Sequence, residues 1–291
     1  MRLNPFDTSN IRVRSSGGGR RMPGGRAGGI GCGTIIIALV AALAFGIDPM
    51  QTIGVVEGVQ QQTAPGQTQQ SDLTEEQICN SGPYANEACN ALQSLNQTWA
   101  PEFQRAGITF RDPQLDLYRD GRVSTNGCGS ASSAAGPFYC PADEVIYIDT
   151  SFYDTMARQL GARGDFARYY VIAHEYGHHI QKLTGLADQV RSLQQQDPRH
   201  ANELQVRMEL QADCYAGVWA GKNKNLIEQG DFEEGMQAAS AIGDDTLQRN
   251  AGQRVSPESF THGSSAQRME ALRLGMKSAN DTACDGYFDV G

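Results

Sequence analysis

The pattern of hydrophobic and polar positions divides the chain into segments of different kinds. Residues 86–107 and most of the chain after Tyr153 repeat apolar positions at intervals of three and four, which predicts amphipathic helices. Between them, residues 107–112, 114–125 and 144–152 have the composition and alternation of short strands. A helix, a small sheet and then a helical bundle predict an α+β, mainly helical domain.

One segment is apolar along its whole length. Residues 30–47, "IGCGTIIIALVAALAFGI", form 18 positions without a charge, between Gly-rich sequence and Asp48-Pro49. As a helix they would be roughly 27 Å long, close to the bilayer's apolar thickness of about 30 Å. Their polar flanks offer no folded neighbours, so we expect a single transmembrane helix rather than a core helix. A cleaved signal peptide is the alternative, since Ala42–Ala44 has the small-x-small pattern, but its basic region would be unusually long.

Charge gives the predicted span a direction. The net charge is −9, yet residues 1–30 carry six arginines against one aspartate, and no Lys or Arg follows until Arg105. The positive-inside rule therefore predicts a cytoplasmic N-terminus and a periplasmic or otherwise extracytoplasmic domain. Composition predicts a disordered basic tail over 1–29 and a flexible linker over 48–72, ahead of a folded domain at 73–291. We expect the membrane as a partner and no nucleic acid.

The seven cysteines fit an extracytoplasmic domain. Cys32 lies in the predicted span and six cysteines follow it. In an oxidising compartment six suggest three disulfides, for which fifteen connectivities are possible. The favoured local pairs are Cys79 with Cys89 and Cys128 with Cys140, which leaves Cys214 and Cys284. Buried free thiols are the alternative, and a zinc ribbon is not expected because no CxxC pair is present.

The segment "VIAHEYGHHI" holds three of the five histidines. His174 and His178 are four residues apart, so on a helix their directions differ by about 40° and both imidazoles can reach one ion. With Glu175 they form the HExxH arrangement of zinc metalloproteases, in which two imidazoles bind Zn²⁺ and the glutamate takes a proton from water. Zn²⁺ lowers the pKa of bound water to about 7 and polarises a carbonyl. His179, rotated by about 100°, is expected beside the site or at the surface.

A third ligand must come from elsewhere in the chain. The residues three and six positions after the second histidine are Gln and Thr, whereas a metzincin has Gly and His there. The gluzincin alternative takes a glutamate from a later helix, and "RMELQADCYAGVWAGK" supplies Glu209. Asp213 lies one turn further on the same face and can accept the distal ring N–H of a ligand histidine. Glu203 is the nearest competitor as ligand.

Several blocks resemble one known family. "VIAHEYGHHIQ", "MELQADCYAGVWA", "AIGDDTLQ" and "FTHGSSAQR" are similar to the motifs of the neutral zinc metallopeptidase family, gluzincin-type bacterial proteins often tethered by an N-terminal membrane helix. The similarity covers roughly Asp112–Cys284, including "GPFYCPADEVIYID". It implies a zincin-like fold and zinc chemistry more directly than it implies a substrate.

The block "FTHGSSAQR" adds His262 as a second catalytic candidate. Negative charge on a carbonyl oxygen in the transition state needs a donor opposite the zinc, and related gluzincins use a histidine or tyrosine for this. Ser264 and Gln267 form a capping box, however, so His262 could equally be structural at a helix start. Tyr215 and Tyr176 are weaker candidates for the donor.

These features predict a membrane-anchored zinc endopeptidase that cleaves peptide or protein substrates. A non-catalytic zinc-stabilised module that binds an envelope partner is one alternative; it would need a fourth protein ligand, and the sequence offers no clear one. A zinc amidase acting on cell-wall peptide is another. The strand at 144–152 could present an edge to extended substrate, if it lies at the edge of its sheet.

Overall fold

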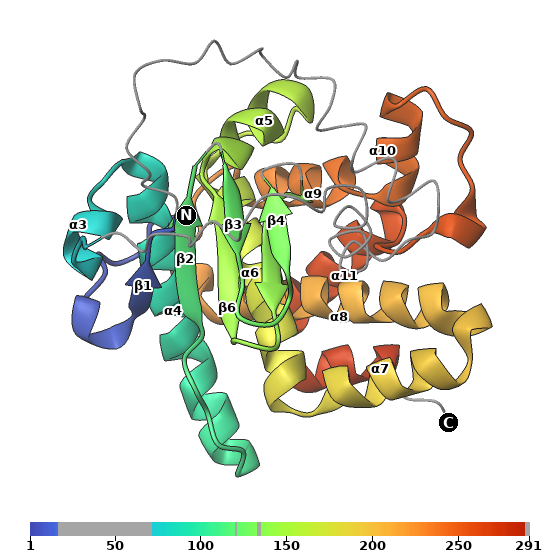
Figure 1. The fold of residues 1–291 in the computed structure, drawn as a ribbon, viewed down its shortest axis with the longest axis horizontal. Helices are drawn as coiled ribbons and strands as arrows, with labels where there is room; N and C mark the ends of the chain where they lie inside the picture. The colour runs from blue at the N-terminus through green and yellow to red at the C-terminus, as the bar shows by residue number, and fades with distance from the viewer. Residues whose placement is uncertain (17–71, 120, 133–134, 289–291) are drawn as a thin grey trace, which may run out of the picture.

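A computed structural model describes residues 1–16, 72–119, 121–132 and 135–288 (Figure 1). The helices are α3 (Glu75–Cys79), α4 (Pro83–Ala106), α5 (Ser151–Gln159), α6 (Asp165–Leu183), α7 (Leu186–Gln196), α8 (Ala201–Lys222), α9 (Asp231–Ala241), α10 (Asp244–Asn250) and α11 (Ser265–Ser278). The strands are β1 (Arg12–Arg14), β2 (Gln114–Tyr118), β3 (Arg122–Ser124), β4 (Ser130–Ser132), β5 (Phe138–Cys140) and β6 (Val145–Asp149). Short 3₁₀ helices are η1 (Thr8–Asn10), η4 (Pro198–His200), η5 (Lys224–Leu226), η6 (Pro257–Ser259) and η7 (Asp281–Tyr287). This composition confirms the α+β class.

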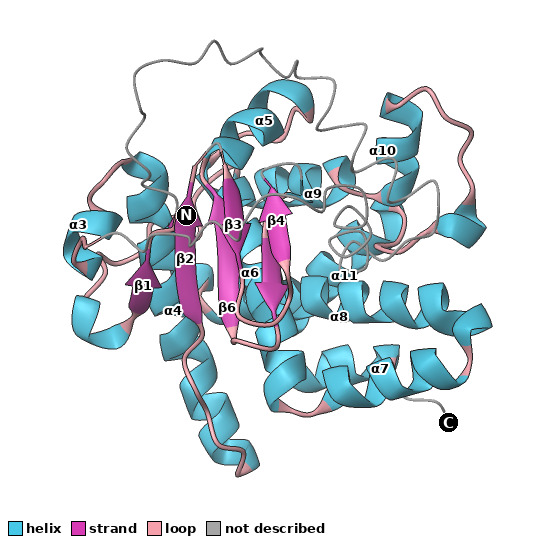
Figure 2. Cartoon of the chain, viewed as in Figure 1, coloured by secondary structure: helices cyan, strands magenta, loops and turns pink. Residues whose placement is uncertain are grey.

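A four-stranded sheet has the order β1-β2-β6-β5. β1, β2 and β6 run parallel and lie side by side in Figure 2, whereas β5 is antiparallel to β6 and lies at the edge of the sheet. All five residues of β6 are buried, as expected for an internal strand. The predicted strands at 114–125 and 144–152 are confirmed, but residues 107–112 form no strand. Since β6 is internal, the edge strand beside it, among the residues that the structure describes, is β5.

The two faces of the sheet are covered differently. Leu115, Ile146 and Ile148 join the main core with the helices. The opposite face carries Tyr118 and Tyr147 and packs in a second cluster with the antiparallel β3–β4 hairpin. Alternating side chains of the same strands therefore serve both cores.

Helix α6 is central to the helical part and packs on α4, α8 and α9, while α8 also packs on α11. Two glycines permit these close approaches. A Cβ on Gly177 would lie 2.7 Å from Ala212 Cα of α8, and a Cβ on Gly275 of α11 would lie 2.0 Å from the Cys214 carbonyl oxygen of α8. Any side chain at either position would push the helices apart.

Three disulfides join the six cysteines in the predicted way. The bonded pairs are Cys79–Cys89, Cys128–Cys140 and Cys214–Cys284. The two local pairs join α3 to α4 and the β3–β4 region to β5, whereas the third joins α8 to η7. The predicted capping box of Ser264 and Gln267 begins α11.

The prediction of a disordered tail over residues 1–29 is wrong for residues 1–16. β1 pairs with β2, Arg14 forms an ion pair with the buried Asp116, and the side chains of Ile11 and Val13 are buried. The amino group of Met1 contacts Asp231 and Asp165. The tail composition that suggested disorder comes mostly from the glycines after Ser16, whereas the apolar residues before it fit the sheet.

Within the described part of the chain, no helix combines the length and apolar character that crossing a membrane requires. The predicted transmembrane helix at 30–47 and the linker up to residue 71 lie outside the described residues, as does the rest of the tail from residue 17.

Candidate metal centre

Helix α6 carries the first two predicted ligands on one face. The imidazole rings of His174 and His178 lie with their centroids 4.9 Å apart, as the spacing of four predicted. Helix α8 brings Glu209 to them: its Oε2 lies 3.1 Å from His174 Nε2 and its Oε1 lies 3.5 Å from His178 Nε2. Gly177, between the two histidines, is the residue that lets α8 approach this closely.

Two imidazole nitrogens and one carboxylate oxygen therefore converge. One ligand atom from each of His174, His178 and Glu209 lies within 4.8 Å of the others. Nitrogen and oxygen donors in this number fit a catalytic zinc site, which has three protein ligands and keeps a further position open. Glu203, the competing ligand, lies at the surface and pairs with Arg207 instead.

A buried charged group holds His174. Asp213 Oδ1 accepts from His174 Nδ1 at 2.8 Å and from the Tyr170 hydroxyl at 2.6 Å. Arg268 from α11 donates to both oxygens of Asp213, at 2.8 and 3.0 Å. Burial would raise the pKa of Asp213, but Arg268 and His174 outweigh burial and hold that pKa below its ordinary value. The structure thus has the predicted contact between Asp213 and one of the two candidate ligand histidines.

A neutral group holds His178. Gln181, one turn later on α6, accepts from His178 Nδ1 at 2.9 Å. Its amide nitrogen donates to the Met208 carbonyl of α8 at 2.8 Å, next to Glu209. In both histidines the Nδ1 atom is occupied by a partner, which leaves each Nε2 atom facing Glu209.

Glu175 is buried beside the two histidines, with 8% of its surface exposed. Burial raises the pKa of Glu175, and the nearby histidines oppose that effect. A carboxyl group whose pKa lies nearer neutrality is better matched to accepting and returning a proton.

His179 has a structural environment. Its ring is fully buried, with Nδ1 2.9 Å from the Tyr139 hydroxyl of β5 and Nε2 2.7 Å from the Arg111 carbonyl oxygen. Burial lowers the pKa of His179 to about 4, so the ring is neutral. It lies beside the ligand set, as predicted, but buried rather than at the surface, and it ties α6 to the edge strand.

His262 lies in the loop before α11, and its Nδ1 atom lies 2.9 Å from the Thr261 hydroxyl. Asp244 holds that loop, because its Oδ2 accepts from the backbone N–H groups of Thr261, His262 and Gly263 at 2.8, 2.7 and 3.0 Å. Burial lowers the pKa of His262, but Glu209 and Asp244 outweigh it and raise that pKa. His262 is therefore within electrostatic reach of Glu209.

The two weaker tyrosine candidates lie elsewhere. The Tyr176 hydroxyl is buried and donates to Asn96 of α4, and Tyr215 packs its ring against Trp99. Neither contact brings a hydroxyl to the three predicted ligands.

Four buried polar residues near the centre were not given roles from the sequence. They are Tyr170, Gln181, Asp244 and Arg268. The sequence does contain a signal for such residues, a charged residue inside a predicted helical segment, such as Arg268 in "SSAQRMEAL". An arginine on a helix is usually solvated, however, so this signal did not mark a buried one.

The fold and this centre define the class of a zinc-peptidase-like α+β domain. The family model described as "Putative neutral zinc metallopeptidase" matches residues 5–287, and the chain belongs to that family. It is 43% identical to "Uncharacterized protein YpfJ" of Escherichia coli strain K12 over 290 residues, which cover 97% of this chain and 96% of that protein. It is 36% identical to "Uncharacterized protein Rv2575" of Mycobacterium tuberculosis strain H37Rv over 265 residues, 84% of this chain and 85% of that protein. No solved structure matches the chain.

Proposed function

We propose that this chain is a zinc-dependent endopeptidase. The observation that carries the proposal is the convergence of His174 Nε2, His178 Nε2 and Glu209 on one point, with Glu175 buried beside them. Three ligands and an adjacent carboxyl group support catalysis over a purely structural role, because a structural zinc site is closed by a fourth protein ligand. Within the described residues the cluster has three members.

Each residue has a separate task in the proposed reaction. Zn²⁺ held by the three ligands would supply Lewis acidity toward the scissile carbonyl and make a water molecule easier to deprotonate. Glu175 accepts the proton from that water and returns it to the leaving amine. His262, with a raised pKa, is suited to donate a hydrogen bond to the carbonyl oxygen as negative charge develops there.

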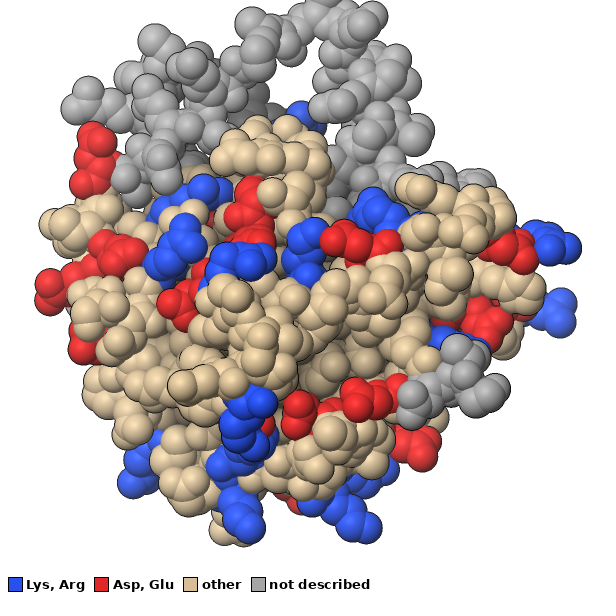
Figure 3. Space-filling model, turned by 90° about the horizontal axis from the view of Figure 1, so that it is seen from below, with Lys and Arg blue, Asp and Glu red and all other residues tan. Residues whose placement is uncertain are grey.

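The substrate is proposed to be an extended peptide. Among the strands that the structure describes, β5 lies at an edge of the sheet, and the Tyr139 hydroxyl of β5 is hydrogen-bonded to His179 of α6. An extended chain that adds to β5 would gain backbone hydrogen bonds next to the centre. On the face in Figure 3, acidic and basic side chains border a largely uncharged middle.

Glu175→Gln tests the mechanism in the full chain. We expect zinc content to stay near one per chain, while cleavage of a mixed peptide library falls roughly 100-fold or more, because the amide cannot accept the proton. Undiminished cleavage, or wild-type protein without zinc, would show that the mechanism is wrong. Cleavage of peptidoglycan fragments but not of proteins would assign the same centre to a cell-wall amidase.

We propose that the domain lies outside the cytoplasm and is attached to a membrane. Three disulfides support an oxidising compartment, and the apolar sequence of residues 30–47 supports attachment. Since β1 pairs with β2, residues 1–16 must lie on the same side of the membrane as the domain, so the proposal includes neither a cytoplasmic N-terminus nor a single membrane crossing by residues 30–47. Cell fractionation of the wild type and of a variant lacking residues 30–47 tests this; a wild-type protein found in the cytosol with free thiols would contradict it.

A further inference from the structure

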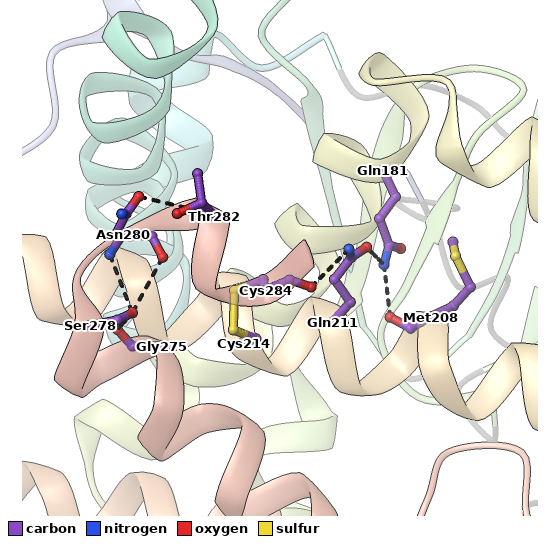
Figure 4. Close-up of a disulfide and its surroundings, with 9 residues drawn as sticks. All are labelled: Gln181, Met208, Gln211, Cys214, Gly275, Ser278, Asn280, Thr282 and Cys284. Carbon is purple, nitrogen blue, oxygen red and sulfur yellow. Dashed lines mark hydrogen bonds between the residues drawn. A yellow bond between two sulfur atoms is a disulfide. The ribbon is translucent and has the colours of Figure 1, made fainter. Parts of the chain in front are cut away.

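A chain of buried hydrogen bonds runs from His178 to the C-terminal segment. His178 Nδ1 donates to Gln181 Oε1 at 2.9 Å, and Gln181 Nε2 donates to Gln211 Oε1 at 2.9 Å. Gln211 Nε2 donates in turn to the carbonyl oxygen of Cys284 at 3.2 Å. Figure 4 shows the two links beyond Gln181 beside the disulfide that joins Cys284 to Cys214. Both glutamines and both cysteines are almost completely buried.

The carbonyl at the far end fixes the direction of every link. A backbone carbonyl can only accept, so Gln211 must turn its NH₂ group to Cys284 and its oxygen to Gln181. Gln181 must then turn its NH₂ group to Gln211 and its oxygen to His178. The Met208 carbonyl accepts the second N–H of Gln181 at 2.8 Å and imposes the same orientation. His178 consequently carries its proton on Nδ1 and keeps the lone pair of Nε2 for a metal.

The disulfide holds the accepting carbonyl in place. Cys284 belongs to η7, which packs on α8 and α11, and its bond to Cys214 closes a separation of 70 residues. Gln211 also lines a cavity of about 290 Å³ whose wall includes Asp285 and Phe288 of the C-terminal segment. If η7 moved away, water from this cavity could reach Gln211 and replace the Cys284 carbonyl, and water can donate as well as accept.

We propose that Gln181 is a positioning residue for the zinc ligand His178, and that Gln211 and the Cys214–Cys284 disulfide keep Gln181 in its orientation. The inference rests on the proposed function only in taking His178 as a zinc ligand. It assigns to the disulfide an effect on zinc affinity, through two amides, in addition to its effect on stability.

Zinc affinity of the full chain, measured by competition with a chromogenic chelator, tests the amides without a substrate. Gln181→Met removes the acceptor and should lower affinity roughly 10- to 100-fold. Gln181→Glu keeps an oxygen for His178 but cannot donate to Gln211 or Met208, so its zinc affinity should lie between those of Gln181→Met and the wild type. Gln211→Met should have a smaller effect, because Met208 still orients Gln181. Gln93→Met is the matched control: Gln93 is also buried and bonded at both ends, but to residues 5 and 7, and zinc affinity should not change.

The disulfide is tested by replacing both of its cysteines with alanine, since alanine cannot bind zinc itself. Cys214→Ala/Cys284→Ala should lower zinc affinity several-fold in the wild-type background and have no further effect in the Gln211→Met background. Cys128→Ala/Cys140→Ala removes a disulfide that is not part of this chain of hydrogen bonds and should leave zinc affinity unchanged. Thermal unfolding of each metal-free variant reports whether it folds.

Each outcome has one meaning. Wild-type affinity in Gln181→Met and Gln211→Met would overturn the inference while leaving the proposed function intact, even if the disulfide variant did not fold. Additive losses from Gln211→Met and the disulfide variant would overturn the role of the disulfide. Wild-type protein that binds no zinc would refute the proposed function and the inference together.

Discussion

His174 and His178 lie one turn apart on α6, yet the groups behind their rings differ in charge. Asp213 and Arg268, an ion pair buried between α8 and α11, hold His174. Gln181 and Gln211, two neutral amides, hold His178. Removing one partner of a buried ion pair lowers the stability of the fold strongly, because the other charge stays uncompensated. Removing a neutral amide leaves only an unsatisfied hydrogen-bonding group and lowers stability less. We call these the charged support and the neutral support.

The difference teaches that each of the two histidines depends on a different part of the fold. The charged support needs α11 to pack on α8, which the glycine at position 275 permits. The neutral support ends at Cys284 and needs the third disulfide. Four changes, ordered from the largest expected effect to the smallest, can break or sharpen the comparison.

Arg268→Met should have the largest effect. It leaves the fully buried Asp213 without its cation, and we expect the free energy of unfolding to fall by about 3–5 kcal/mol in denaturant titrations. Gln211→Met, the corresponding change in the neutral support, should cost about 1–3 kcal/mol. Equal losses would remove the distinction between the two supports. Arg199→Met, at an exposed arginine, is the control and should leave stability unchanged.

The charged support should also dominate the pH dependence of the metal-free protein. Burial lowers the pKa of His174, but Asp213 and Glu209 outweigh burial and raise it to about 10. Because this folded-state pKa lies above the ordinary value, the proton stabilises the fold below about pH 6.5, and that stabilisation is lost as pH rises through about 10.

Zinc must displace that proton, so we expect zinc affinity to rise with pH across this range. Asp213→Asn should lower the pKa of His174, and NMR titration of the imidazole signals in metal-free protein measures it. A wild-type His174 that titrates below pH 7 would contradict the assignment.

Tyr170→Phe should have an intermediate effect. It removes one donor to the ionised Asp213, and hydrogen bonds to charged groups contribute about 1.5–3 kcal/mol. Thermal or denaturant unfolding measures the loss. Tyr153→Phe is the matched control, because among the described residues the buried Tyr153 hydroxyl has no hydrogen-bond partner. If both variants lost equal stability, the Tyr170 contact with Asp213 would contribute nothing.

Glu203→Gln should have the smallest effect. Glu203 lies on the same helix as Glu209, but at the surface, where it pairs with Arg207 one turn away. Surface pairs of this kind contribute little, so zinc content and stability should match the wild type. Loss of zinc from this variant, together with retention of zinc in Glu209→Gln, would show that Glu203 rather than Glu209 is the third ligand.

Much of the centre was predictable because it depends on local periodicity. A spacing of four on a helix brings His174 and His178 to one face, and the same rule relates Glu209 to Asp213. The disulfide pairs between neighbouring cysteines, and the start of α11 at Ser264, also follow from short-range geometry. These predictions agree with the structure because no distant segment has to be placed to make them.

Other features could not be predicted because they depend on packing between distant segments. β1 joins the sheet by pairing with residues about a hundred positions later, and the composition of the first thirty residues concealed it. The residues that hold His174 show the same limit. Asp213 could be proposed from the helical spacing of its own segment, whereas Arg268, on another helix, could not.

By itself the sequence determined which residues carry the proposed zinc chemistry, since the HExxH spacing acts within one helix turn. Only the tertiary structure decided how these residues are held. Helix contact at Gly177 brings Glu209 within 3.5 Å of both rings, packing at Gly275 brings Arg268 to Asp213, and a disulfide brings the Cys284 carbonyl to Gln211. The physical reason is that hydrogen bonds and ion pairs act over about 3 Å, and only the packed chain brings segments 30 to 90 residues apart within that distance.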